Sequence, residues 1–138
     1  KPIAVIFNLG VNDLGNAGNY VSYMTSIAST LKSKNCKLFY MSVNPINSTM
    51  ITKAGRGART EAQVREFNSK IRSGLSLDYK YIDMYSVLMK KGYGTNASYN
   101  GTDADSDDGL HYTTKTFKRI YYYCITYLNT GSINASYY

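Results

Sequence analysis

Short apolar runs alternate along the chain with longer segments in which apolar and polar residues mix at helical spacing. The run Ile3–Phe7 is continuously apolar, which is typical of a central parallel strand that is covered on both faces. Two further runs of strand character cover 37–43, which ends before Asn44-Pro45, and 79–84. The pattern therefore predicts three strands separated by segments long enough for helices.

Apolar residues three and four positions apart predict a helix after each strand. The first helix is expected over 17–32, and the second follows a polar loop over 46–59. Thr60 with Gln63 forms a capping-box pattern at the start of that second helix. The last helix begins near residue 113, and its predicted apolar face comprises Phe117, Ile120, Tyr121, Cys124, Ile125 and Leu128. This alternation predicts an α/β fold with a parallel sheet.

Length and composition narrow the class of protein. The 138 residues and the apolar fraction of 43% fit one globular domain, and no stretch approaches the roughly 20 apolar residues of a membrane span. The net charge of +7 comes from scattered basic residues, which favours a solubilising surface over a footprint for an anionic polymer. Cys36 and Cys124 are too few for a disulfide scaffold; a buried thiol is expected for Cys124, and a single disulfide stays open.

Two polar motifs follow predicted strands. Asp108-Gly109-Leu110-His111 contains the only histidine of the chain. A carboxylate three residues before a histidine, on a turn, can hold one imidazole tautomer and stabilise the charge that a general base acquires. In the stretch 10–13 (Gly-Val-Asn-Asp), the amide of Asn12 can donate to a developing oxyanion. Because ligands bind at the carboxyl ends of parallel strands, the two motifs are expected to converge at one sheet edge.

Each motif also has a purely structural interpretation. Asp108-Gly109 is a common turn, in which case His111 simply precedes a helix. Asn12 and Asp13 are residue types found in turns and at helix N-termini. The spacing alone leaves both interpretations open.

Two other clusters of charge favour solvated loops. The acidic run Asp103–Asp107 resembles the opening of a calcium-binding loop, but aspartate 108 replaces the expected glycine and threonine 114 the expected glutamate. Three arginines could hold an anionic substrate group, although a solvated position is favoured for each of them: Arg56, Arg59 and Arg65.

The ordered pair of motifs resembles the SGNH (GDSL-type) hydrolase family. The stretch 10–13 matches its G-x-N-D block, 108–111 matches its D-x-x-H block, and the strand–helix units between them agree. The resemblance implies a three-layer, flavodoxin-like parallel sheet and a serine esterase or lipase that acts on acyl esters without a metal or organic cofactor. It also implies roles for single residues. These are His111 as general base, Asp108 as its orienting acid and Asn12 as oxyanion donor, with Gly10 and Asp13 supporting the loop.

The family's Gly-Asp-Ser block, which carries the nucleophile, does not occur in the sequence. We therefore expect an upstream segment or a separate chain to carry the catalytic serine. On this view 1–138 is the C-terminal portion of a single SGNH-hydrolase-like domain whose N-terminal strands are missing, and it is inactive alone. Without those strands Ile3–Phe7 would be an open apolar edge, which natural proteins avoid.

The sequence therefore predicts a serine ester hydrolase that acts on acyl or acetyl esters, such as those of carbohydrate or cell-wall polymers. Its expected partners are the ester substrate and the serine-bearing segment, with no nucleic acid, no metal and no membrane span. The tyrosine-rich composition and the habit of the family favour an extracellular or cell-surface location. The alternative is a non-catalytic α/β binding module for an anionic polymer, which the charge of +7 would suit. The acyl chain, the alcohol and the oligomeric state stay open.

Overall fold

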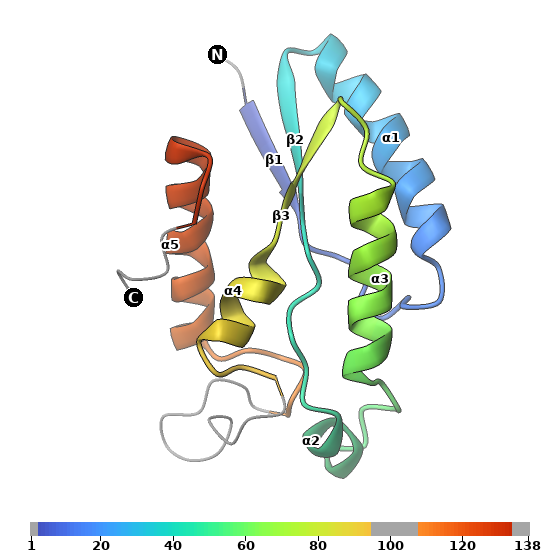
Figure 1. Ribbon diagram of the computed structural model, residues 1–138, viewed down its shortest axis with the longest axis vertical. Coiled ribbons are helices and arrows are strands. Elements are labelled where there is room, and N and C mark those ends of the chain that lie inside the picture. The colour runs from blue at the N-terminus through green and yellow to red at the C-terminus, as the bar shows by residue number, and fades with distance from the viewer. Residues whose placement is uncertain (1–2, 95–107, 134–138) are drawn as a thin grey trace. The chain divides into compact units, whose positions relative to one another are not determined.

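Three parallel strands and the helices that connect them follow the alternation in the sequence (Figure 1). The computed structural model describes residues 3–94 and 108–133, and within them the fold is α/β. The chain forms two compact units. Unit one comprises 1–43 and 62–83, and unit two comprises 44–61 and 84–138. The position of one unit relative to the other is not determined.

Unit one contains the sheet. Its strands are β1 (Ile3–Phe7), β2 (Cys36–Met41) and β3 (Tyr79–Ile82), in the order β1-β2-β3, with both pairs parallel. The prediction that Ile3–Phe7 is a central strand covered on both faces is wrong for the described residues. Here β1 pairs with β2 alone and lies at an edge, and none of its five residues is buried. The buried centre of the sheet is β2, from Leu38 onward.

Two helices cover one face of this sheet: α1 (Ala17–Ser33) and α3 (Glu61–Ser73) (Figure 1). Right-handed crossovers between parallel strands place successive helices on the same face. The two helices are in contact: the rings of Tyr20 in α1 and Phe67 in α3 meet edge to face with centroids 5.3 Å apart. The predicted helix over 17–32 is confirmed to within one residue at its end.

Two short helices occupy segments that were expected to be a loop and the end of a strand. The loop predicted over 46–59 contains α2 (Ser48–Lys53), which begins after Asn47, whose side chain accepts a hydrogen bond from the Met50 amide. The third strand ends at residue 82, and α4 (Met84–Lys90) starts where the strand was expected to finish. Both helices have fewer than eight residues, so neither shows two full turns of apolar periodicity.

Unit two is organised around a buried carboxylate and a group of buried aromatic rings. Glu61 accepts hydrogen bonds from the backbone amide of Ile46 and, at 2.7 Å, from the hydroxyl of Tyr85. Tyr93 and Tyr112 meet edge to face with centroids 5.7 Å apart. The hydrogen bonds of Glu61 join the segment before α2 to α4. The ring contact joins the segment after α4 to the segment before the last helix.

The last helix, α5 (Thr114–Thr130), begins within one residue of its predicted start but buries a different face. The prediction was right for Ile120 and Cys124. It was wrong for the larger group, which is exposed: Phe117, Tyr121, Ile125 and Leu128. Tyr123 and Thr116 are buried instead, and the hydroxyl of Thr116 donates to Tyr93. A hydropathy pattern predicts that the aliphatic stripe of the helix is the buried face. It cannot predict the burial of a hydroxyl, because a buried hydroxyl needs a hydrogen-bond partner that can lie far away in the sequence. No helix in the described residues has the length and apolar character needed to cross a membrane.

One buried and one half-buried tyrosine make the stability of unit one sensitive to alkaline pH. The rings of Tyr40 and Tyr81 stack with centroids 6.4 Å apart, and the Tyr40 hydroxyl donates to the carbonyl of Leu9. Burial raises the pKa of Tyr40 far above its ordinary value. Burial, and next the Asp83 carboxylate, raise the pKa of Tyr81 to about 12. Because the folded state retains these protons longer than the unfolded state, their contribution to stability is complete below about pH 10 and is lost as the pH rises towards the folded pKa values.

We expect the free energy of unfolding in urea to fall between pH 10 and pH 12. The slope of this free energy against pH should approach about 1.4 kcal/mol per pH unit for each tyrosine hydroxyl that is ionised in the unfolded state but still protonated in the folded state. Tyr40→Phe removes one of these groups and should show a shallower fall, measured relative to its own stability at pH 8. Equal slopes for Tyr40→Phe and the wild type would refute this interpretation.

Candidate active site

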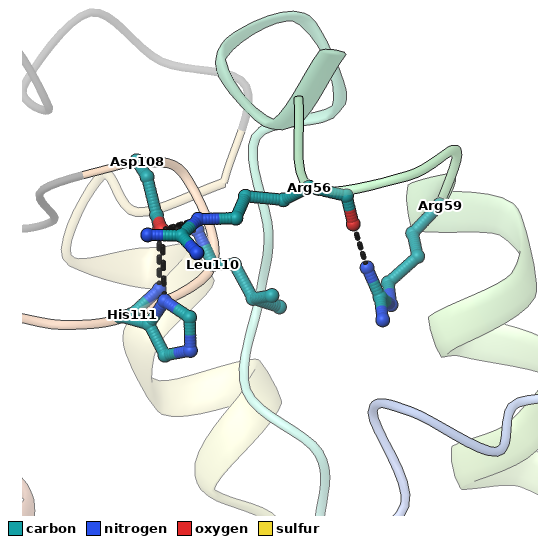
Figure 2. Close-up of polar contacts among 5 residues, drawn as sticks. All are labelled: Arg56, Arg59, Asp108, Leu110 and His111. Atoms are coloured by element: carbon teal, nitrogen blue, oxygen red, sulfur yellow. Dashed lines mark hydrogen bonds and ion pairs between the residues drawn. The ribbon is translucent and has the colours of Figure 1, made fainter. Parts of the chain in front are cut away.

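Asp108 folds the motif 108–111 into a tight turn with its own side chain (Figure 2). Its Oδ1 accepts hydrogen bonds from the backbone amides of Leu110 at 2.9 Å and His111 at 2.8 Å. Such aspartate turns are a common local alternative to regular structure. The turn brings the imidazole back towards the carboxylate three residues earlier, and the spacing of the motif follows from this geometry.

Gly109 lets this turn pack closely against the start of α2. Its φ is +81°, in the left-handed region, and a Cβ atom there would lie 2.6 Å from the carbonyl oxygen of Asn47 and 2.8 Å from Cβ of Met50. The Gly109 carbonyl accepts a hydrogen bond of 2.8 Å from the Asn47 amide. Glycine at this position therefore satisfies both the backbone conformation and the close approach.

Asp108 and His111 form a hydrogen-bonded pair. The His111 Nδ1 atom lies 2.8 Å from Asp108 Oδ2 (Figure 2). The Asp108 side chain is 9% exposed, whereas that of His111 is 61% exposed. An ionised carboxylate accepts from Nδ1–H, so the other ring nitrogen, Nε2, carries the basic lone pair. The far edge of the ring points away from Asp108 in Figure 2. The structure therefore supports both interpretations of the motif at once, a turn and an oriented base.

The carboxylate of this pair is held in its ionised form. Burial raises the pKa of the Asp108 carboxyl, but hydrogen bonds from the backbone amide and the ring of His111, and from the Leu110 amide, together outweigh that effect. The net result is a pKa well below the ordinary value for aspartate. Asp108 is therefore an acceptor throughout the neutral range and does not itself take up a proton there.

Arg56 is a third member of the cluster. Its Nε donates to Asp108 Oδ2 at 2.9 Å, so this oxygen accepts from both the guanidinium and the imidazole (Figure 2). The solvated position expected for Arg56 is confirmed, because the residue is exposed. The structure adds an ion pair between its guanidinium and Asp108. No local pattern predicts this contact, because Arg56 and Asp108 are 52 residues apart.

The other motif, 10–13, forms a turn in unit one. The Asp13 amide donates to the Gly10 carbonyl at 2.9 Å, and Asp13 Oδ2 accepts from the hydroxyl of Tyr20 at 2.9 Å. Asn12 is exposed on this turn. The N-cap of α1 is Asn16, so neither Asn12 nor Asp13 caps the helix. Asp108 and His111, in unit two, are brought together by the structure. Gly10, Asn12 and Asp13 lie in the other unit, and convergence of the two motifs stays a prediction.

Other candidate chemistry is limited within 3–94 and 108–133. These residues contain no group of three or more histidine, cysteine or acidic side chains that could hold a metal ion. The acidic run 103–107 lies outside the described residues. Neither Cys36 nor Cys124, both among the described residues, forms a disulfide, and Cys124 is buried as predicted. Burial raises the pKa of the Cys124 thiol, which makes it a poor nucleophile.

Comparison of the sequence with protein-family models gives no match, and comparison with curated proteins gives none either. The chemistry of this site therefore rests on its own geometry.

Proposed function

We propose that the chain is the histidine-bearing portion of a serine ester hydrolase of the SGNH type, with a three-layer, flavodoxin-like sheet. The observation that carries the proposal is the hydrogen bond of 2.8 Å between His111 Nδ1 and Asp108 Oδ2. A buried, ionised carboxylate that orients an exposed imidazole with a basic Nε2 is the arrangement that general-base catalysis requires.

In the proposed reaction, His111 takes the proton of a serine hydroxyl as the serine Oγ attacks the carbonyl carbon of an acyl ester. The bond between this carbon and the alcohol oxygen then breaks, and the imidazolium returns the proton to the leaving alkoxide. Water repeats both steps on the acyl-serine, releasing a carboxylic acid and restoring the hydroxyl. Asp108 remains ionised and stabilises the imidazolium in each half of the reaction.

The proposal assigns the serine to a segment upstream of Lys1, because Gly-Asp-Ser does not occur in the sequence. The edge position of β1 supports this assignment, since a further strand there would cover an exposed apolar edge that includes Ile3, 65% exposed. Asn12 keeps the role of oxyanion donor, supported by its exposed position on the turn after β1. Acyl or acetyl esters of carbohydrate or cell-wall polymers are the proposed substrates, at an extracellular or cell-surface location.

Hydrolysis of p-nitrophenyl acetate by the longest natural polypeptide that contains this chain tests the proposal. We expect saturable turnover that a phosphonofluoridate inhibitor abolishes, because the inhibitor reacts with an activated serine. Residues 1–138 alone should give no turnover above the buffer rate. A full polypeptide without turnover, or with turnover that resists the inhibitor, would show that the proposal is wrong.

The net charge of +7 favours one other function, a non-catalytic module that binds an anionic polymer. Binding of this kind weakens steeply as the salt concentration rises, because it releases counterions. We would then expect salt-dependent retention on polyphosphate that is the same for the wild type and for His111→Ala. Esterase activity that depends on His111 favours the hydrolase.

A further inference from the structure

The loop after α2 holds the backbone of Arg56 from both sides. The Arg56 amide donates to the carbonyl of Ile51 at 3.1 Å, and the Arg56 carbonyl accepts from the guanidinium of Arg59 (Figure 2). Gly55 and Gly57, on either side, have φ values of +65° and +81°. Glycine adopts these conformations without steric cost, so the two glycines in the sequence favour this shape of the loop. Arg56 therefore extends from a defined turn rather than from a loop without internal contacts.

The guanidinium reaches the same oxygen that orients the histidine. Arg56 Nε and His111 Nδ1 lie 2.9 and 2.8 Å from Asp108 Oδ2. The other oxygen, Oδ1, is occupied by two backbone amides of the turn. Both ends of the carboxylate are thus fixed, one by its own turn and one by a cation from a distant loop.

We propose that Arg56 is a positioning residue that acts on His111 through Asp108. The guanidinium fixes the rotamer of the carboxylate and shares Oδ2, so it limits how strongly Asp108 stabilises a protonated imidazole. A cation near the ring also repels the imidazolium directly. Both effects disfavour the protonated imidazole relative to a pair that lacks Arg56. The consequence for catalysis rests on the proposed function, but the effect on the imidazole does not.

Removal of this cation should move the titration of His111 to higher pH. The chain has one histidine, so the ring Hε1 signal in a proton NMR titration of residues 1–138 needs no assignment. We expect the midpoint in Arg56→Gln to lie about half a unit to one unit above the wild type, since Arg56 is half-exposed and its charge is partly screened. Arg56→Lys keeps the charge and should show a smaller displacement.

Lys53→Gln is the matched control, because it removes the same charge from an exposed position in the last turn of α2. Its midpoint should stay within about 0.2 units of the wild type, as expected for a screened surface charge. An Arg56→Gln midpoint that equals the wild type, or that moves no further than in Lys53→Gln, would overturn the proposal. If Arg56→Gln does not fold, the titration midpoint of Arg56→Lys is compared with that of Lys53→Gln instead. A displacement no larger than in Lys53→Gln would then overturn the proposal.

Kinetics of the full polypeptide separate this role from substrate binding. A positioning role predicts that Arg56→Gln changes kcat for the neutral ester p-nitrophenyl acetate and moves the acid limb of its pH profile upward. If Arg56 instead binds an anionic group of the substrate, the variant raises KM for an anionic ester only, and the positioning proposal fails. Absence of any esterase activity would refute the proposed function while leaving the NMR result to decide the role of Arg56.

Discussion

Replacement of His111 by alanine is expected to lower kcat for p-nitrophenyl acetate hydrolysis by the full polypeptide by about 10³-fold. In the proposed function the imidazole accepts the serine proton through Nε2, since Nδ1 is hydrogen-bonded to Asp108. Without it the serine hydroxyl must ionise unaided. KM should change little, because the ring is not expected to hold the ground-state ester.

Asp108→Asn should produce a loss between about 10² and 10⁴-fold, since an amide can hold the imidazole in the wrong tautomer. Asp78→Asn is the matched control: it removes a carboxylate whose partner, Lys32, is a surface residue 72% exposed. Its kcat should stay within about twofold of the wild type. Wild-type turnover in either His111→Ala or Asp108→Asn would show that the pair is a turn without a catalytic role.

Gly10→Ala is expected to destabilise the protein by about 3 kcal/mol. Gly10 has a φ of +122°, which side chains rarely adopt, and an added Cβ would lie 2.5 Å from Cζ of Phe67. The Phe67 ring is fully buried and packs edge to face on Tyr20, so it cannot move aside without disturbing the contact between α1 and α3. Urea unfolding followed by circular dichroism measures the change.

Gly15→Ala provides the comparison within the same loop. Nothing lies within 4 Å of a Cβ at Gly15, and its φ is not positive. We expect this variant to remain within about 0.5 kcal/mol of the wild type. If Gly10→Ala is as stable as Gly15→Ala, the close packing of the 10–13 turn against α3 is wrong.

The parts of the fold that the sequence predicted well have long, regular patterns. The helix over 17–32 has several turns of apolar periodicity, and the strand of β2 ends near a proline, so both were located to within two residues. The short helices α2 and α4 offered too few turns to be distinguished from a loop and from the end of a strand. The buried face of α5 depends on partners such as Tyr93, which a helical pattern does not contain.

The same distinction between local and distant contacts explains which contacts of the candidate site could be predicted from the sequence. The Asp108–His111 pair was predictable, because three residues and one glycine suffice to build the turn that joins them. The ion pair from Arg56 was not predictable, since it joins loops 52 residues apart. The strand β1 was located correctly, but its apolar run could not reveal that it lies at the edge of the described sheet with none of its residues buried.

Mapping the site of a fluorophosphonate label tests the central claim most directly. The full polypeptide is labelled with an excess of the probe, digested and examined by mass spectrometry, in the wild type and in His111→Ala. The account predicts one labelled serine, upstream of Lys1, with labelling strongly reduced in the variant because His111 activates that hydroxyl. A label on a serine within residues 1–138, or equal labelling in both proteins, would contradict it.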